Sequence, residues 1–261
     1  MFDNIIVGVD GREGGQDAIA LADQLAAPTA SVTPTTVYDA EHRPAHGSSV
    51  AQELHEAAER GECDLLVVGS CRRGVMGRMV HGDETTDLLT GAPCAVAIAP
   101  PGYAVDHRPL SRIGVGFDGS PEAKQALVAA RRLADRRGSS IKALLVLPVQ
   151  SRPYGEPVGH RWPDIAGLLA EDDDHRFDEL WDVDAKVGYG RPGEELEHFS
   201  EELDLLIVGS RRRSHLRRTV AGSTSNHLAR RTRCPLLALP GPTNEGSDPL
   251  TRQEESCSTM S

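Results

Sequence analysis

The chain has 261 residues, with 28 lysines and arginines against 39 aspartates and glutamates, so its formal net charge is −11. A chain this acidic repels a phosphate backbone, which argues against general nucleic-acid binding. A hydrophobic content of 39 % is enough to bury real cores, and no apolar run is long enough to cross a membrane as a helix.

The cysteines and the N-terminus predict a cytoplasmic protein. The five cysteines form an odd set without a C-x-x-C pair, which is typical of reduced thiols rather than of a disulfide framework. The first ten residues, MFDNIIVGVD, lack the charged segment and the long apolar run of a signal peptide.

The first part of the chain alternates short apolar runs with a helical segment. IIVGVD (residues 5–10) is a β-type run that ends at an Asp-Gly turn, and SSVAQELHEAAERG (48–61) has room for one helix. LLVVG (65–69) is apolar without alternation, as in a central strand of a parallel sheet covered on both faces. AVAIAP (95–100) reads as a last strand.

The second part repeats this order at greater length. IGVGFD (113–118) predicts a strand, and Ser120 as N-cap, Pro121 at the first helical position and Gly138 as the stop predict the helix after it. The remaining predicted elements are a strand at 141–147, a helix within 161–181, a strand at 184–190, an apolar central strand at 205–209 and a last strand at 235–240.

The two parts are copies of one unit. Asp10 matches Asp118, a spacing of 108, whereas Gly69 matches Gly209, a spacing of 140, so the second copy holds 32 extra residues. We therefore expect two α/β domains in tandem, each a Rossmann-like open parallel five-stranded sheet, with the first one abbreviated. The expected ranges are 1–105 and 106–242, followed by a disordered tail at 243–261.

A binding site is predicted where the strand order of the second domain reverses, because open parallel sheets bind ligands there, at the carboxyl ends of the strands. The first strand and LLIVG flank this point and end at Asp118 and Gly209. An arginine-rich loop follows, and then Gly222, Ser223, Thr224 and Ser225 open a helix. The N–H groups and positive end of a helix, with hydroxyls at its first turn, form a phosphate cradle in chemical terms.

These motifs resemble the universal stress protein family in a tandem two-domain form, over nearly residues 1–242. The resemblance rests on V-x-x-D-G-S at the first strand, the VGS loop, the GSxS helix start and the C-P-L-L-A-L-P ending. The family's nucleotide-binding members carry G-x2-G-x9-G-[ST], which Gly209, Gly222 and Ser223 match. The resemblance implies one site for ATP or ADP, with or without Mg²⁺, at these residues: Gly116, Asp118, Leu147, Val208, Gly209, Arg212, Gly222, Ser223, Thr224 and Ser225.

The chain departs from that motif in both copies. Arg212 stands at the middle glycine position, where a positive φ would cost about 1–3 kcal/mol. In the first copy the middle position is Arg72 and the hydroxyl position is Asp83. A carboxylate 4 Å from a phosphate charge opposes binding by about 4 kcal/mol at an effective dielectric near 20. We therefore expect the first site to be degenerate.

Each site residue also has an interpretation without a ligand. Asp118 suits an Asx turn, Ser223 suits a helix N-cap, and the loop arginines suit a solvated basic face. The alternative function is then a nucleotide-free paired scaffold that acts through protein contacts. By the resemblance the last strands pair the two domains as an intrachain pseudo-dimer; a homodimer of the whole chain and the identity of a protein partner stay open.

Enzyme classes find little support in the sequence. No G-x4-G-K-[ST] motif is present, and the G-x-G-x-x-G match at 114–119 lies inside a strand rather than after it. The S-G-G-x-D-S loop of adenylyl-transferring and ATP-pyrophosphatase relatives is replaced by DGREGG and DGSPEA. We expect no catalytic residues and no metal site, and thus a stress-response binding module with at most slow ATP hydrolysis.

Overall fold

The computed structural model describes residues 2–9, 13–36, 49–70, 82–106, 108–147, 162, 177–210 and 222–241. The predicted tail at 243–261 and most of the predicted helix at 161–181 lie outside these residues. The end of that helix is described, and it forms a 3-10 turn, η2 (Asp178–Leu180).

The elements follow the predicted alternation. The first half consists of β1 (Phe2–Val9), α1 (Glu13–Leu25), β2 (Ala26–Thr36), α2 (Val50–Arg60), β3 (Leu65–Gly69), α3 (Gly82–Leu89), β4 (Ala95–Ala99) and α4 (Tyr103–Asp106). The second half consists of β5 (Arg112–Phe117), α5 (Pro121–Arg137), β6 (Ser140–Leu147), η2, β7 (Asp184–Tyr189), α7 (Pro192–Phe199), η3 (Ser200–Glu202), β8 (Leu205–Ser210), α8 (Ser223–Arg231) and β9 (Leu236–Pro240).

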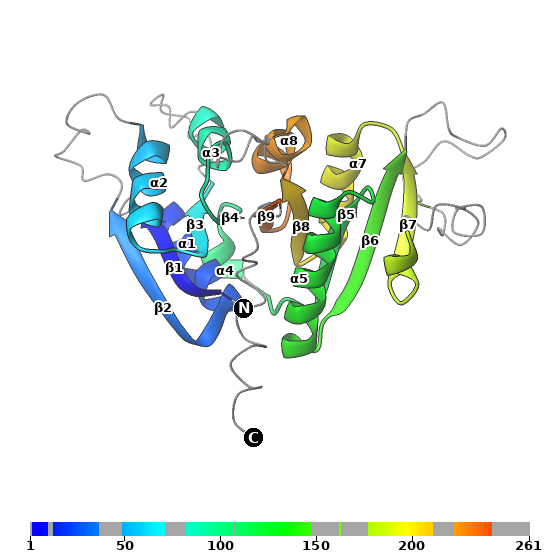
Figure 1. Cartoon of the computed structure of the whole chain (residues 1–261), viewed down its shortest axis with the longest axis horizontal. Helices are drawn as coiled ribbons and strands as arrows, with labels where there is room; N and C mark the ends of the chain where they lie inside the picture. The colour runs from blue at the N-terminus through cyan, green and yellow to red at the C-terminus, as the bar shows by residue number, and fades with distance from the viewer. Residues whose placement is uncertain are drawn as a thin grey trace, which may run out of the picture.

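The nine strands of the described residues form one sheet, in the order β2-β1-β3-β4-β9-β8-β5-β6-β7 (Figure 1). The first half contributes four strands and the second half five, and the pairing within each half is parallel. β4 and β9 pair antiparallel at the centre and join the halves. The predicted fold class, an open parallel α/β sheet in two tandem copies with a shorter first copy, is confirmed.

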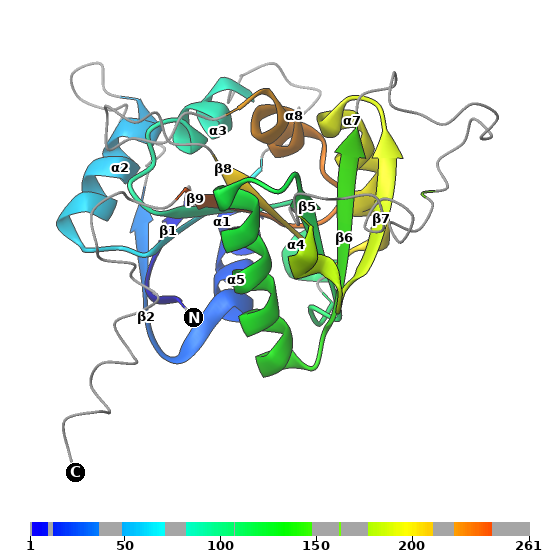
Figure 2. The ribbon, with the colours of Figure 1, turned by 45° about the vertical axis from the view of Figure 1, so that its right-hand side comes forward.

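Helices cover both faces of the sheet. One buried cluster contains residues of α1, α4 and α5, and the cluster on the other face contains residues of α2, α3, α7 and α8. Figure 2 shows α3, α8 and α7 in a row along the top of the view, with α5 in front of the sheet below them. Strands covered on both faces are apolar at successive positions, which explains why LLVVG and LLIVG lack alternation.

The ends of α5 form as the sequence predicts. The Ser120 hydroxyl accepts a hydrogen bond from the Ala123 N–H at 3.2 Å, and Pro121 occupies the first turn. Gly138 ends the helix with a φ of +69°, a conformation that a glycine adopts without strain. This helix start places Asp118 and Ser120 at the carboxyl end of β5.

An aspartate at the equivalent position in each half, Asp64 or Asp204, anchors the first strand of that half. The Asp64 carboxylate accepts hydrogen bonds from the N–H groups of Asp3 at 2.7 Å and Asn4 at 3.2 Å. Asp204 accepts from the Arg112 N–H at 2.9 Å and also pairs with the Arg112 guanidinium. These contacts tie β1 to the start of β3, and β5 to the start of β8, so the repeat extends to individual polar contacts.

Because Tyr103, in α4, is buried, we expect the free energy of unfolding to decrease at high pH. Burial, with a smaller contribution from Asp204, raises the pKa of its hydroxyl to about 12. Because the folded pKa lies above the unfolded value near 10, the stability is complete below pH 10 and is lost as the pH rises toward 12. We expect the free energy of unfolding to fall by about 2 kcal/mol more in the parent protein than in Tyr103→Phe between pH 9 and pH 11.5, measured by urea titration. Equal slopes for the two proteins would contradict this assignment.

Candidate functional site

The strand order reverses between β5 and β8, as predicted. β5 is followed by β6 and β7 on one side of it, whereas β8 and β9 lie on its other side. In register, Gly116 of β5 lies opposite Val208 of β8 and Leu144 of β6. The carboxyl ends of these strands therefore meet at one edge of the sheet, together with Leu147 at the end of β6.

Asp118 follows β5 and is exposed at this edge. One carboxylate oxygen, Oδ1, accepts a hydrogen bond from the Ser120 N–H at 3.0 Å. This is an Asx turn, the ligand-free interpretation that the sequence allowed. The turn holds the exposed carboxylate in the connection between β5 and α5.

Gly209 is required for packing. A Cβ at this position would lie 2.5 Å from the carbonyl carbon of Glu122, in the first turn of α5. Gly69 has the same role in the first half, since its Cβ would lie 2.0 Å from the carbonyl oxygen of Gly14. Both glycines therefore let a helix pack directly on a central strand.

Gly222, Ser223, Thr224 and Ser225 open α8 as predicted, but Ser223 is not its N-cap. The N-cap is Gly222, which provides no side-chain hydrogen bond to the helix. Ser223 is exposed, Thr224 is half-buried and Ser225 is buried. Among the described residues no side chain caps these first-turn N–H groups, which carry the partial positive charge of a helix start.

Space is open around Gly222. Apart from its own neighbours in the chain, no described residue has an atom within 4 Å of the position that its Cβ would take. Its φ is −69°, so neither packing nor backbone conformation requires a glycine there. The glycine leaves the backbone at the start of α8 accessible from the sheet edge.

Ser210 is a residue that the sequence analysis did not select. It ends β8, is only 3 % exposed, and its hydroxyl has no hydrogen-bond partner among the described residues. Its counterpart in the first half, Ser70, donates to the Ala99 carbonyl at 3.0 Å. A buried hydroxyl without a partner costs about 1–3 kcal/mol. The sequence shows the serine of the VGS motif in both halves. Only the structure shows that Ser210 lacks the hydrogen bond that Ser70 forms.

α7 and α8 also hold a polar contact that the sequence did not indicate. His227 of α8 lies 2.7 Å from a carboxylate oxygen of Glu197 on α7, joining its Nε2 atom to Oε2. The ring of His227 packs against Gly193, where a Cβ would approach within 2.9 Å. This contact fixes α8, and therefore its N-terminus, against the α7 side of the sheet.

Several predicted features lie outside the described part of the chain. Arg212, the other loop arginines and Arg72 belong to such segments, and for Asp83 only the backbone is described, in the first turn of α3. Within the described ranges, no three histidine, cysteine or acidic side chains are grouped closely enough to hold a metal ion. None of the helices among these residues is long and apolar enough to cross a membrane.

The sequence profile described as "Universal stress protein family" matches residues 41–100 and 109–240. The chain belongs to the universal stress protein family. The first matched segment covers β3 and β4 of the first half and the second covers all five strands of the second half, so this universal stress protein has the tandem form that the motifs indicated.

Curated relatives and solved structures agree with this family. A universal stress protein of Mycolicibacterium smegmatis is 27 % identical over 236 residues, covering 87 % of this chain and 77 % of its own length. One from Mycobacterium tuberculosis is 28 % identical over 186 residues, covering 67 % of this chain and 61 % of its own. A crystal structure of a universal stress protein from Archaeoglobus fulgidus has the same fold, with a TM-score of 0.62 at 15 % identity over 91 % of this chain and 98 % of that one.

Proposed function

We propose that this universal stress protein is a cytoplasmic stress-response module that binds one adenine nucleotide, ATP or ADP, at the edge formed by β5, β8 and α8. The observation that carries the proposal is the difference between Ser210 and Ser70. The buried hydroxyl lacks a described partner only in the second half, the half whose α8 begins without a side-chain cap among the described residues. A polar ligand at this edge would supply the missing partner.

The proposed contacts follow from the chemistry of each group. The phosphates would take the first-turn N–H groups of α8 and the hydroxyls of Ser223 and Thr224, because anions bind at helix N-termini. Open space at Gly222 allows them to approach the backbone. Asp118 would accept from the nucleoside, and Val208 and Leu147 would flank the base. Loop arginines such as Arg212 would pair with phosphate oxygens, with Mg²⁺ accompanying ATP.

We place the site in the second half alone. In the first half Ser70 already uses its hydroxyl, and Asp83 stands at the start of α3 where the second half has Ser223. The residue ranges 1–105 and 106–242 then form two domains of an intrachain pseudo-dimer, one with a degenerate site and one with a working site. The nucleotide would act through conformation or through a protein partner, with slow ATP hydrolysis at most.

Calorimetric titration with ATP tests the proposal. We expect Ser223→Asp to weaken ATP binding at least tenfold, because a carboxylate would then stand beside the phosphates. Ser111→Asp is the matched control, since it adds the same charge at an exposed position before β5, at the opposite end of that strand. It should bind ATP like the parent protein.

Two results would overturn the nucleotide site. One is the absence of both binding heat and co-purified nucleotide, detected by mass spectrometry of the purified protein. The other is an equal loss of affinity in Ser223→Asp and Ser111→Asp. Either result would leave the nucleotide-free scaffold as the function.

A further inference from the structure

Two cysteines of the first half lie next to each other. Cys63 and Cys94 precede the neighbouring parallel strands β3 and β4, which pair through Leu65 and Ala95. The Cys94 thiol donates to the Cys63 sulfur, and the two Sγ atoms are 3.9 Å apart. Both thiols are free. A disulfide needs the sulfurs about 2.0 Å apart, so they must approach each other by about 2 Å to form one.

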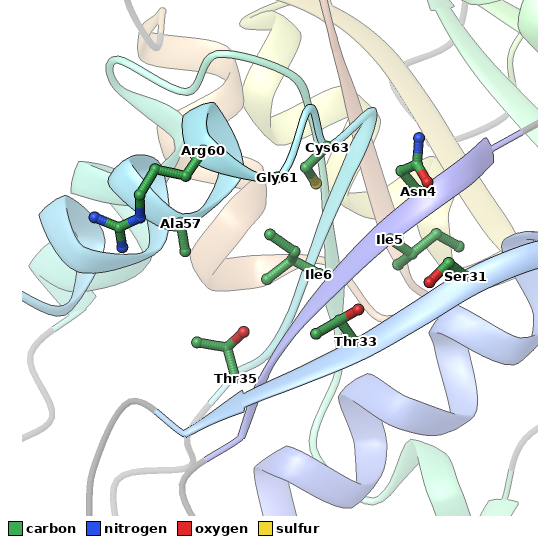
Figure 3. Close-up of a pocket in the computed structure, with 10 residues that line it drawn as sticks. All are labelled: Asn4, Ile5, Ile6, Ser31, Thr33, Thr35, Ala57, Arg60, Gly61 and Cys63. Atoms are coloured by element: carbon green, nitrogen blue, oxygen red, sulfur yellow. The ribbon is translucent and has the colours of Figure 1, made fainter.

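Cys63 is reached from outside through a cavity of about 350 Å³. The cavity lies between β1, β2 and α2, and its lining includes Ile6, Thr33 and Arg60. Figure 3 shows Thr33 and Thr35 on β2, with Cys63 at the opposite end of the cavity from Thr35. Cys63 is half-buried, whereas Cys94 is only 7 % exposed. A small oxidant therefore meets Cys63 first.

The second half provides an internal comparison. Cys234 occupies the position of Cys94 and is also buried, but the position of Cys63 is Leu203. Leu203 is buried beside Gly114, where a Cβ would come within 2.0 Å of the leucine side chain. The buried cysteine is thus common to both halves as a small core residue. The second thiol is present in the first half alone.

The two thiols have unequal acidity. The hydrogen bond from Cys94 lowers the pKa of Cys63, and this outweighs the effect of burial, which acts in the opposite direction. The same contact and the burial of Cys94 raise the pKa of the Cys94 thiol. The accessible sulfur is therefore the first to ionise, and thiolates are the reactive form.

We propose that Cys63 and Cys94 form a redox-active dithiol that a hydroperoxide converts to an intramolecular disulfide. The Cys63 thiolate attacks the O–O bond, becomes a sulfenic acid and releases hydroxide, or an alkoxide from an organic peroxide. The Cys94 sulfur then attacks the sulfenic sulfur, the S–S bond forms, and water leaves with the hydroxyl group and the Cys94 proton. The two sulfurs are oxidised by two electrons in total, and the peroxide is reduced.

The test uses the full chain with Cys71→Ser and Cys257→Ser, so that Cys63, Cys94 and Cys234 are its only thiols. The protein is treated with hydrogen peroxide, denatured, alkylated and measured by intact mass and peptide mapping. We expect two of the three alkylation sites to be lost, with a peptide that joins residues 63 and 94. Cys234 should remain fully alkylated.

Matched variants show whether the pair is responsible. In Cys63→Leu, which copies the second half, the cross-linked peptide should be absent and both remaining cysteines should be alkylated; Cys63→Ser is a second variant in case leucine disturbs the fold. In Cys94→Ser, Cys63 should accumulate as sulfenic or sulfinic acid without a disulfide. The proposal is overturned if the parent forms no 63–94 cross-link, if its cross-links join two molecules, or if Cys234 reacts as fast as Cys63.

Discussion

Replacing Gly209 with alanine is expected to destabilise the protein by about 3 kcal/mol. The added Cβ would lie 2.5 Å from the Glu122 carbonyl carbon and 2.6 Å from its oxygen, which are backbone atoms of α5. The helix can relieve this contact only by moving away from β8, since neither partner is the end of a flexible side chain. Equilibrium unfolding in urea measures the loss directly.

Gly222→Ala is the matched control for Gly209→Ala, because both positions belong to the same glycine motif. Open space and a φ of −69° allow a Cβ at residue 222, so its stability should stay within about 0.5 kcal/mol of the parent protein. Similar losses of stability in the two variants would show that the contact between α5 and β8 is not the reason for Gly209.

Leu237→Ala is expected to cost about 4 kcal/mol, because this fully buried side chain lies in β9 opposite Ala97 of β4. The cavity would form at the centre of the sheet, where the two halves join. We therefore expect urea unfolding to remain a single transition that moves to lower denaturant, followed in parallel by circular dichroism and by the fluorescence of Trp162 and Trp181.

Val105→Ala is the control for Leu237→Ala, since Val105 is 86 % exposed and its truncation should change stability by less than about 0.5 kcal/mol. The idea that the sheet is one cooperative unit fails if Leu237→Ala unfolds in two steps. In that case the first half would unfold at the denaturant concentration of the parent protein.

Local signals in the sequence predicted much of the fold. Ser120, Pro121 and Gly138 determine the ends of α5 through contacts within a few residues. The apolar runs at β3 and β8 indicated central strands, and the strand order does reverse between β5 and β8, the two strands expected to flank that point. These predictions succeeded because each depends on short-range chemistry or on the comparison of one copy with the other.

Features that depend on distant partners were not predictable. The role of Gly209 depends on how closely α5 approaches it. The role of Ser210 depends on whether its hydroxyl meets a carbonyl, as that of Ser70 does. The pairing of Cys63 with Cys94 depends on the register of β3 and β4. Of these positions only that of Cys63 differs between the halves, where the second half has Leu203. At the others the residue is the same, and only the packing around it shows its role.

The candidate site stays a prediction, but the local structure of two of its parts is described. Asp118 follows β5 and forms an Asx turn, and α8 begins after Gly222, which is its N-cap in place of Ser223. A serine after a glycine fits either cap assignment, and only the backbone angles distinguish them. The contribution of Arg212 stays a prediction.

The junction of β4 with β9 brings together unlike sequences, since Val96 lies opposite Ala238 and Ile98 lies opposite Leu236. In a symmetric dimer of identical short chains, each mutation would appear in both subunits at once. A covalent tandem escapes that constraint, because each half is encoded by its own codons. A substitution can then change one half without changing the other, and the two halves are always present in equal numbers.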